Sequence, residues 1–81
     1  MSAVKTAVVA RFKDLCAQRG WTANMLATES GITASTVYSL LDPSRGTATI
    51  DTIKILCDGL NITLGEFFST PEFDDLEQEI K

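Results

Sequence analysis

The sequence contains no histidine, and it has only two cysteines and two prolines. Histidine is the commonest general base and a frequent metal ligand, so its absence weighs against catalysis and against a metal site. Cys16 and Cys57 lack the spacing of metal ligands and are too few for a secreted disulfide framework. Each falls on an apolar helical stripe, which predicts two small core residues.

Other marks of enzymes and membrane proteins are also missing. The sequence has no glycine-rich phosphate loop and no nucleophile placed beside a base. Asp74 and Asp75 would point about 100° apart on a helix rather than share a site. The apolar start of the chain is interrupted by Lys5 and Thr6, and no apolar run approaches the roughly 18 residues that span a bilayer. We therefore expect a cytoplasmic protein that is not an enzyme, has no cofactor or metal and has no membrane partner.

The acidic charge of the chain is concentrated at its C-terminal end. The 81 residues carry a net charge of −4, and residues 1–71 are neutral because they hold six acids and six bases. A neutral body with an acidic tail exerts little long-range attraction on DNA. For one subunit this predicts weak non-specific binding and a shallow salt dependence.

What the chain does have is a series of apolar stripes at helical spacing, with nothing that suggests strands. Helices are expected over residues 3–18, 22–30, 34–41 and 49–60, with a loop at 42–47. A short fifth helix begins at a capping box formed by Thr63 and Glu66. Residues 71–80 offer a further apolar stripe, but ten residues are too few for an isolated helix. That segment must pack on the body, pair with another subunit or fray.

Residues 22–41 are the most informative part of the sequence. Thr22 is expected to cap one helix, and Gly31 to supply the positive φ that ends it. Thr33 caps a second helix, whose inward side carries Val37 and Leu40. Two short capped helices joined by a glycine turn describe the helix-turn-helix, which presents its second helix to the major groove of DNA.

From Arg11 to Phe68 the chain resembles the phage-repressor and Cro-type (XRE-family) helix-turn-helix regulators of bacteria and phages. The matching stretches include Arg11-Phe12-Lys13-Asp14-Leu15, Gly20-Trp21-Thr22, Met25-Leu26-Ala27, Ser30-Gly31-Ile32-Thr33, Ser35-Thr36-Val37-Tyr38 and the run from Cys57 to Phe68. The resemblance implies an all-α, five-helix repressor-like domain over residues 1–70, with a short sixth helix in an acidic C-terminal tail over 71–81. It also implies a sequence-specific transcriptional regulator, of the repressor kind, that binds double-stranded DNA as a homodimer.

The resemblance carries base contacts to the second helix of the motif, at Ala34, Ser35, Tyr38 and Ser39. Hydroxyl groups pair with several base edges, so the two serines should discriminate bases less sharply than a bidentate side chain. Ala34 is suited to a thymine methyl. Tyr38 is expected to reach a base edge or a phosphate, the alternative being an ordinary exposed surface residue.

Phosphate contacts are carried over to the starts of both motif helices and to the loop that follows. Arg45 is the only cation in the recognition region and is the main candidate, the alternative being a solvated loop charge. The flanking cations Lys5, Arg11 and Lys13 are further candidates. The full set of expected phosphate contacts within the motif is Thr22, Ala23, Asn24, Thr33, Ser44, Arg45 and Thr47.

The chain departs from the family pattern at several of these places. Ala23 stands where the family often has a glutamine that binds phosphate, and the carboxylate of Asp42 would repel phosphate. The family also often pairs an arginine at the place of Cys16 with a glutamate at the place of Leu41. Both are apolar here, and replacing both partners of a buried ion pair is often neutral or stabilising. We therefore predict that Cys16 and Leu41 are in contact.

Two-fold pairing would double the small DNA-binding surface of one such domain. The candidate dimer anchors are Phe67, Phe68, Phe73, Leu76 and Ile80, the alternative being that Phe67 and Phe68 only close the core of the monomer. A different class of function also fits the acidic tail and the sparsely charged recognition helix. The protein would then be a protein-binding module, such as an antitoxin or antirepressor, that binds DNA weakly or not at all and uses its tail on a basic partner.

Overall fold

The computed structural model describes residues 3–42, 44–45, 47–78 and 80, and within these it forms six helices and no strand. The helices are α1 (Ala3–Arg19), α2 (Ala23–Ser30), α3 (Ala34–Leu41), α4 (Ile50–Gly59), α5 (Leu64–Phe67) and α6 (Pro71–Asp74). The predicted all-α fold with five repressor-like helices and a short sixth is confirmed. No helix in the described ranges is both long and apolar enough to cross a membrane.

Threonine hydroxyls fix where four of the helices begin. Each hydroxyl accepts a hydrogen bond from a backbone N–H in the first turn, at Thr22, Thr33, Thr49 and Thr63. At α5 the cap is reciprocal, because the Glu66 carboxylate also accepts the N–H of Thr63 at 3.0 Å. A side-chain cap stabilises a helix by about 1 kcal/mol. Each cap joins residues three positions apart, so these helix starts could be predicted from the sequence.

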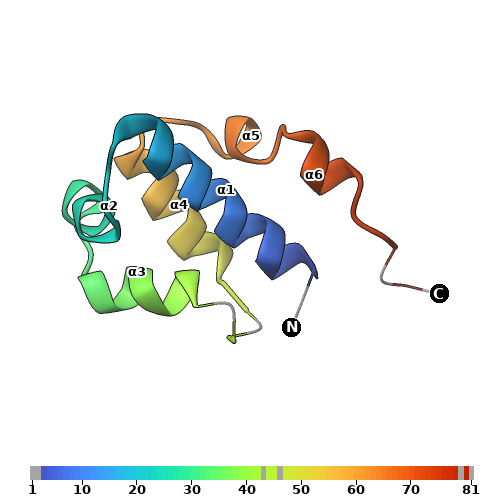
Figure 1. Ribbon diagram of the computed structural model, residues 1–81, viewed down its shortest axis with the longest axis horizontal. Coiled ribbons are helices and arrows are strands. Elements are labelled where there is room, and N and C mark those ends of the chain that lie inside the picture. Colours follow the sequence, from blue (N-terminus) through green and yellow to red (C-terminus); the bar gives the residue numbers. More distant parts are fainter. Residues whose placement is uncertain (1–2, 43, 46, 79, 81) are drawn as a thin grey trace.

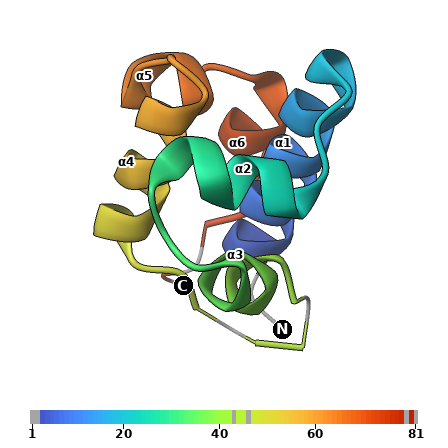
Figure 2. The ribbon, with the colours of Figure 1, turned by 90° about the vertical axis from the view of Figure 1, so that its left-hand side faces the viewer.

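Each of the first five helices contributes at least one wholly buried side chain to the core. In chain order, one from each helix, these include Phe12, Leu26, Val37, Leu56 and Phe67. Helix α2 packs against both α3 and α4. In the two ribbon views α3 lies along one edge of the molecule, while α5 and α6 lie toward the opposite edge (Figures 1 and 2). The core therefore holds α3 from its inner side only.

Helices α2 and α4 approach each other closely at Ser30 and Gly59. A β-carbon built on Gly59 would lie only 2.1 Å from the Ser30 Oγ. That hydroxyl is buried and has no hydrogen-bond partner within the described ranges. The Ser30 side chain thus points into this contact between the two helices. The absence of a side chain at Gly59 is what lets the two helices come so close.

The aromatic side chains of α5 and α6 form a cluster on the core. The rings of Phe12 and Phe67 are 4.4 Å apart between centroids, and those of Phe68 and Phe73 are 4.8 Å apart. Phe67 has no exposed surface, whereas Phe68 and Phe73 are half-buried. The prediction that Phe67 anchors a dimer is therefore wrong, and the alternative, that it closes the core of the monomer, is the observed one.

The helical stripe expected over 71–80 is wrong in length, since α6 ends at Asp74. Phe73 and Leu76 are half-buried, but Ile80 is 85% exposed and so buries little of its side chain. A short helix requires tertiary packing to offset the cost of nucleation. Here that packing stops at Leu76, and the residues between are mostly acidic.

Both cysteines are buried, which confirms their assignment to the core. Burial raises the pKa of the Cys16 and Cys57 thiols. Cys16 and Leu41 line one groove between α1 and α3. They are therefore neighbours, as expected from their places in the family's ion pair. Their direct contact stays a prediction.

Candidate nucleic-acid interface

Helix α3 presents a polar, exposed side and an apolar, buried one. Val37 and Leu40 are buried, whereas Ser35, Tyr38 and Ser39 are exposed, Tyr38 to 53%. Figure 2 shows α3 nearly along its axis at the lower edge of the molecule, with α2 crossing above it. Three of the four expected base-contacting residues therefore share one open side of a helix.

The fourth residue, Ala34, is half-buried and packs against the core. It offers less surface to a ligand than the sequence suggested, because part of its side chain packs against the core. Thr36 is exposed instead and was missed. Its hydroxyl lies 2.9 Å from that of Thr33, the N-cap residue. The spacing of three residues between these two threonines was the signal that could have found it.

The start of α2 places two polar residues at the surface and one apolar residue inside. Thr22 and Asn24 are exposed, as phosphate contacts would require. Ala23 is half-buried and lines the groove that Tyr38 also lines. Ala23 packs partly against the core, and its assignment as a phosphate contact stays a prediction.

Lys13 occupies a more central place than the sequence assigned to it. This exposed lysine of α1 lines the same groove as Tyr38 and Asp42. It therefore lies beside the open side of α3, whereas sequence reasoning treated it as a flanking charge. Helical periodicity puts Lys13 on the outer side of α1, but only the packing of α3 against α1 puts it next to Tyr38.

Two other cations donate hydrogen bonds to backbone carbonyls of the protein itself. The Arg11 Nε donates to the carbonyl oxygen of Phe67 at 2.8 Å, and its guanidinium also donates to that of Glu66 at 2.9 Å. Arg19 donates to the carbonyl oxygen of Leu60 at 2.7 Å. Carbonyls at helix C-termini are natural partners for such cations. Arg11 is thus engaged within the protein, and its expected contact with the DNA backbone stays a prediction.

The loop after α3 is organised by the side chain of Asp42. Its Oδ1 accepts hydrogen bonds from the Ser44 N–H at 2.9 Å and from the Ser44 hydroxyl at 2.7 Å. The Arg45 Nε lies 3.7 Å from its Oδ2. The Ser44 hydroxyl, then its N–H, and then the charges of Arg45 and Lys5 lower the pKa of the Asp42 carboxyl. The carboxylate is thus occupied within the loop, which reduces the expected repulsion of phosphate.

The expected phosphate contacts of the loop differ in whether their side chains are available to a ligand. The hydroxyl proton of Ser44 is committed to Asp42, so it is not offered to a phosphate oxygen. Arg45 and Thr47 are exposed and line a groove shared with Thr36 and Ser39 of α3. Two residues of the predicted loop at 42–47, Pro43 and Gly46, lie outside the described residues.

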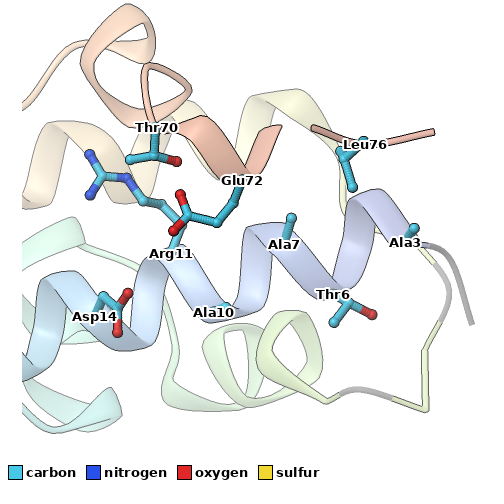
Figure 3. A pocket seen from close by; sticks show the side chains of 9 residues that line it. All are labelled: Ala3, Thr6, Ala7, Ala10, Arg11, Asp14, Thr70, Glu72 and Leu76. Atoms are coloured by element: carbon cyan, nitrogen blue, oxygen red, sulfur yellow. The ribbon is translucent and has the colours of Figure 1, made fainter. Parts of the chain in front are cut away.

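The C-terminal segment forms a second groove, against α1. In Figure 3 the small side chains of Ala3, Ala7 and Ala10 lie along α1, with Thr70, Glu72 and Leu76 across from them. Leu76 is one of the expected dimer anchors. The views in Figures 1 and 2 place α6 away from α3, so the acids of α6 do not adjoin the exposed serines. The acidic charge of α6 therefore lies away from the recognition helix α3.

Comparison with known proteins agrees with this arrangement. The family model for a Cro/C1-type HTH DNA-binding domain matches residues 11–72. The solved structure titled "Crystal structure of the prophage Lp1 protein 11" is similar, with a TM-score of 0.80 and 29% sequence identity, and the match covers 94% of this chain and 100% of that one. No curated protein matches the chain.

Proposed function

The chain belongs to the family of Cro/C1-type helix-turn-helix DNA-binding domains, and from that premise we propose that it is a sequence-specific transcriptional repressor that binds operator DNA as a homodimer. The observation that carries the proposal is the open side of α3, where Ser35, Tyr38 and Ser39 are exposed together. In this binding mode α3 enters the major groove and these hydroxyls meet base edges. Lys13, Arg45 and Thr47 then approach the phosphates on either side of the groove.

The proposal is tested by selecting bound sites from a pool of random duplex DNA. We expect one enriched sequence, arranged as an inverted repeat because a two-fold dimer binds two half-sites. Tyr38→Ala should change the preferred bases, while Arg45→Ala should weaken all sequences about equally. Lys54→Met is the matched control, since Lys54 is an exposed lysine of α4 that pairs with Asp58. A pool that shows no enrichment would reject sequence-specific binding.

The homodimer part of the proposal rests on the remaining exposed apolar side chains. With Phe67 in the core, the expected anchors reduce to the exposed parts of Phe68, Phe73 and Leu76, together with Ile80. Ile80→Asp should weaken dimerisation in sedimentation equilibrium while leaving the helical content unchanged. Unchanged dimerisation in this variant would move the interface elsewhere, for which Ile50, an exposed apolar residue of α4, is the next candidate.

One observation favours the second candidate, a protein-binding module of the antitoxin or antirepressor type. Arg11 and Arg19 are used on backbone carbonyls inside the protein, which leaves few cations for DNA. The acidic segment lies away from α3 and would be free to meet a basic partner. A failed DNA selection, combined with retained binding to a basic protein that is lost on deletion of residues 75–81, would support this candidate.

A further inference from the structure

Lys5 is a buried cation in the first turn of α1. Only 3% of its surface is exposed, although lysine is almost never fully buried unless it is paired. It also lies before residue 11, where the match to the family model begins. Neither the helical pattern of α1 nor the family match explains why a lysine stands here.

The ammonium group of Lys5 is held by the backbone of the loop that follows α3. Its Nζ donates to the carbonyl oxygens of Arg45 at 3.0 Å and Thr47 at 3.1 Å, and more weakly to that of Asp42 at 3.5 Å. An ammonium has three N–H donors and no acceptor. These three carbonyls satisfy the charge that burial would otherwise penalise, and they tie together residues about forty positions apart in the chain.

The same contacts hold the loop on its buried side, where the Lys5 ammonium lies. Within the described part of the loop, further restraints are the Ser44 bonds to Asp42, the Arg45–Asp42 ion pair and a backbone bond from the Arg45 N–H to the Asp42 carbonyl. While the carbonyls of Arg45 and Thr47 face the buried ammonium, the Arg45 side chain is 64% exposed. Arg45 and Thr47 line one groove with Ser39 of α3. A shift of the loop would therefore change where these side chains lie relative to α3.

We propose that Lys5 is a positioning residue for DNA binding, whose ammonium fixes the loop after α3 so that Arg45 and Thr47 meet the phosphates flanking the groove that α3 enters. The inference rests on the proposed function. Lys5 does not touch DNA, because its ammonium is covered by the loop that it organises. It acts through Arg45 and Thr47, whose carbonyls it holds.

The test compares Lys5→Met, which keeps most of the apolar stem and removes the charge, with Arg45→Ala and with the double variant, on the DNA site selected by the wild type. We expect Lys5→Met to weaken binding by about tenfold, as loss of a charge-assisted phosphate contact would. The double variant should be weaker than Arg45→Ala by clearly less than the tenfold loss that Lys5→Met causes alone, because residues that act as a unit are not additive. Lys54→Met, which removes the same charge elsewhere, should have little effect.

A structural readout without DNA completes the test. In Lys5→Met the amide resonances of Ser44, Arg45 and Thr47 should shift, while those of Ser35 and Ser39 stay in place. If Lys5→Met does not fold, Lys5→Gln, which keeps two N–H donors without the charge, should show the same pattern with a smaller loss. Losses that multiply in the double variant, or an affinity that falls while the loop amides stay unmoved, would overturn the inference.

The two proposals fail in different ways. If the wild type selects no DNA site, the proposed function fails, while the loop amides still report whether Lys5 fixes the loop. If the wild type selects a site and Lys5→Met or Lys5→Gln binds it as tightly as Lys54→Met does, the proposed function stands and the positioning role of Lys5 is rejected.

Discussion

Ser30 and Gly59 show how one residue limits the approach of two helices. The Ser30 hydroxyl is buried without a partner in the described part of the chain, and it occupies the space that a β-carbon at Gly59 would need. A buried, unpaired polar group costs free energy. Ser30 and Gly59 therefore combine close helix packing with a buried, unpaired hydroxyl. Substitutions at the two positions can measure these two effects separately.

Ser30→Ala should raise the free energy of unfolding by about 0.5–1 kcal/mol, because it removes an unpaired hydroxyl and introduces a better helix former. Gly59→Ala should lower it by about 1–3 kcal/mol through overpacking. Urea denaturation measures both. Ser39→Ala is the control, since it makes the same change on the exposed side of α3. A clear loss of stability in Ser30→Ala would mean that the hydroxyl is satisfied in solution.

At the scale of elements, α5 is too short to be stable by itself. It has four residues, a capping box at its start and the guanidinium of Arg11 at its end. Its one buried side chain, Phe67, closes the core beside Phe12. The position of α5 thus depends on groups at both ends rather than on helical propensity.

Arg11→Met should lower the free energy of unfolding by about 1–2 kcal/mol, because the carbonyls of Glu66 and Phe67 lose charge-assisted donors. Arg11→Lys should fall between this variant and the wild type, since lysine keeps the charge but not the forked geometry. Hydrogen exchange should become faster at the amides of α5 and stay unchanged in α2. Equal stability of Arg11→Met and the wild type would show that these bonds contribute nothing net.

At the scale of the whole molecule, the distribution of charge matters more than its sum. The net charge of −4 arises in the C-terminal segment, and the ribbon views place α6 away from α3. Of the cations in the body, Arg11, Arg19 and Lys5 bind backbone carbonyls, and Lys54 pairs with Asp58. Lys13 and Arg45 each line a groove with residues of α3, so these two cations adjoin the proposed interface.

This count predicts how DNA affinity depends on salt. Two phosphate-neutralising cations in each subunit of a dimer give a slope of log K against log[salt] of roughly −4, from about 0.9 per phosphate. Fluorescence anisotropy on the selected site, between low and moderate salt, measures the slope. Lys13→Met and Arg45→Ala should each make it shallower by about two units in a dimer. A wild-type slope of twice the expected steepness would show that the cations bound to backbone carbonyls also reach the DNA.

Much of the fold followed from local signals. The threonine caps, the positive φ of Gly31 and the capping box at Thr63 all lie where the sequence predicted them, because each acts within four residues of itself. The length of α6 did not follow, since it depends on whether Leu76 and Ile80 find apolar partners. Sequence reasoning assigned Lys5 and Arg11 to DNA for a related reason. The sequence gives the sign of each charged side chain, but it does not show which distant group that side chain will bind.

The sequence by itself determined that the chain is all-α, that two capped helices meet at a glycine turn, and that the hydroxyl-bearing side of the second helix faces outward. These are matters of helical period and of hydrogen bonds between near neighbours. Only the tertiary structure decided that Phe67 is core, that Lys13 adjoins Tyr38 and that Lys5 holds the loop beside Arg45. The physical reason is that burial and pairing depend on surfaces brought together from distant parts of the chain, and the energy of a charge or an aromatic ring is set by what then surrounds it.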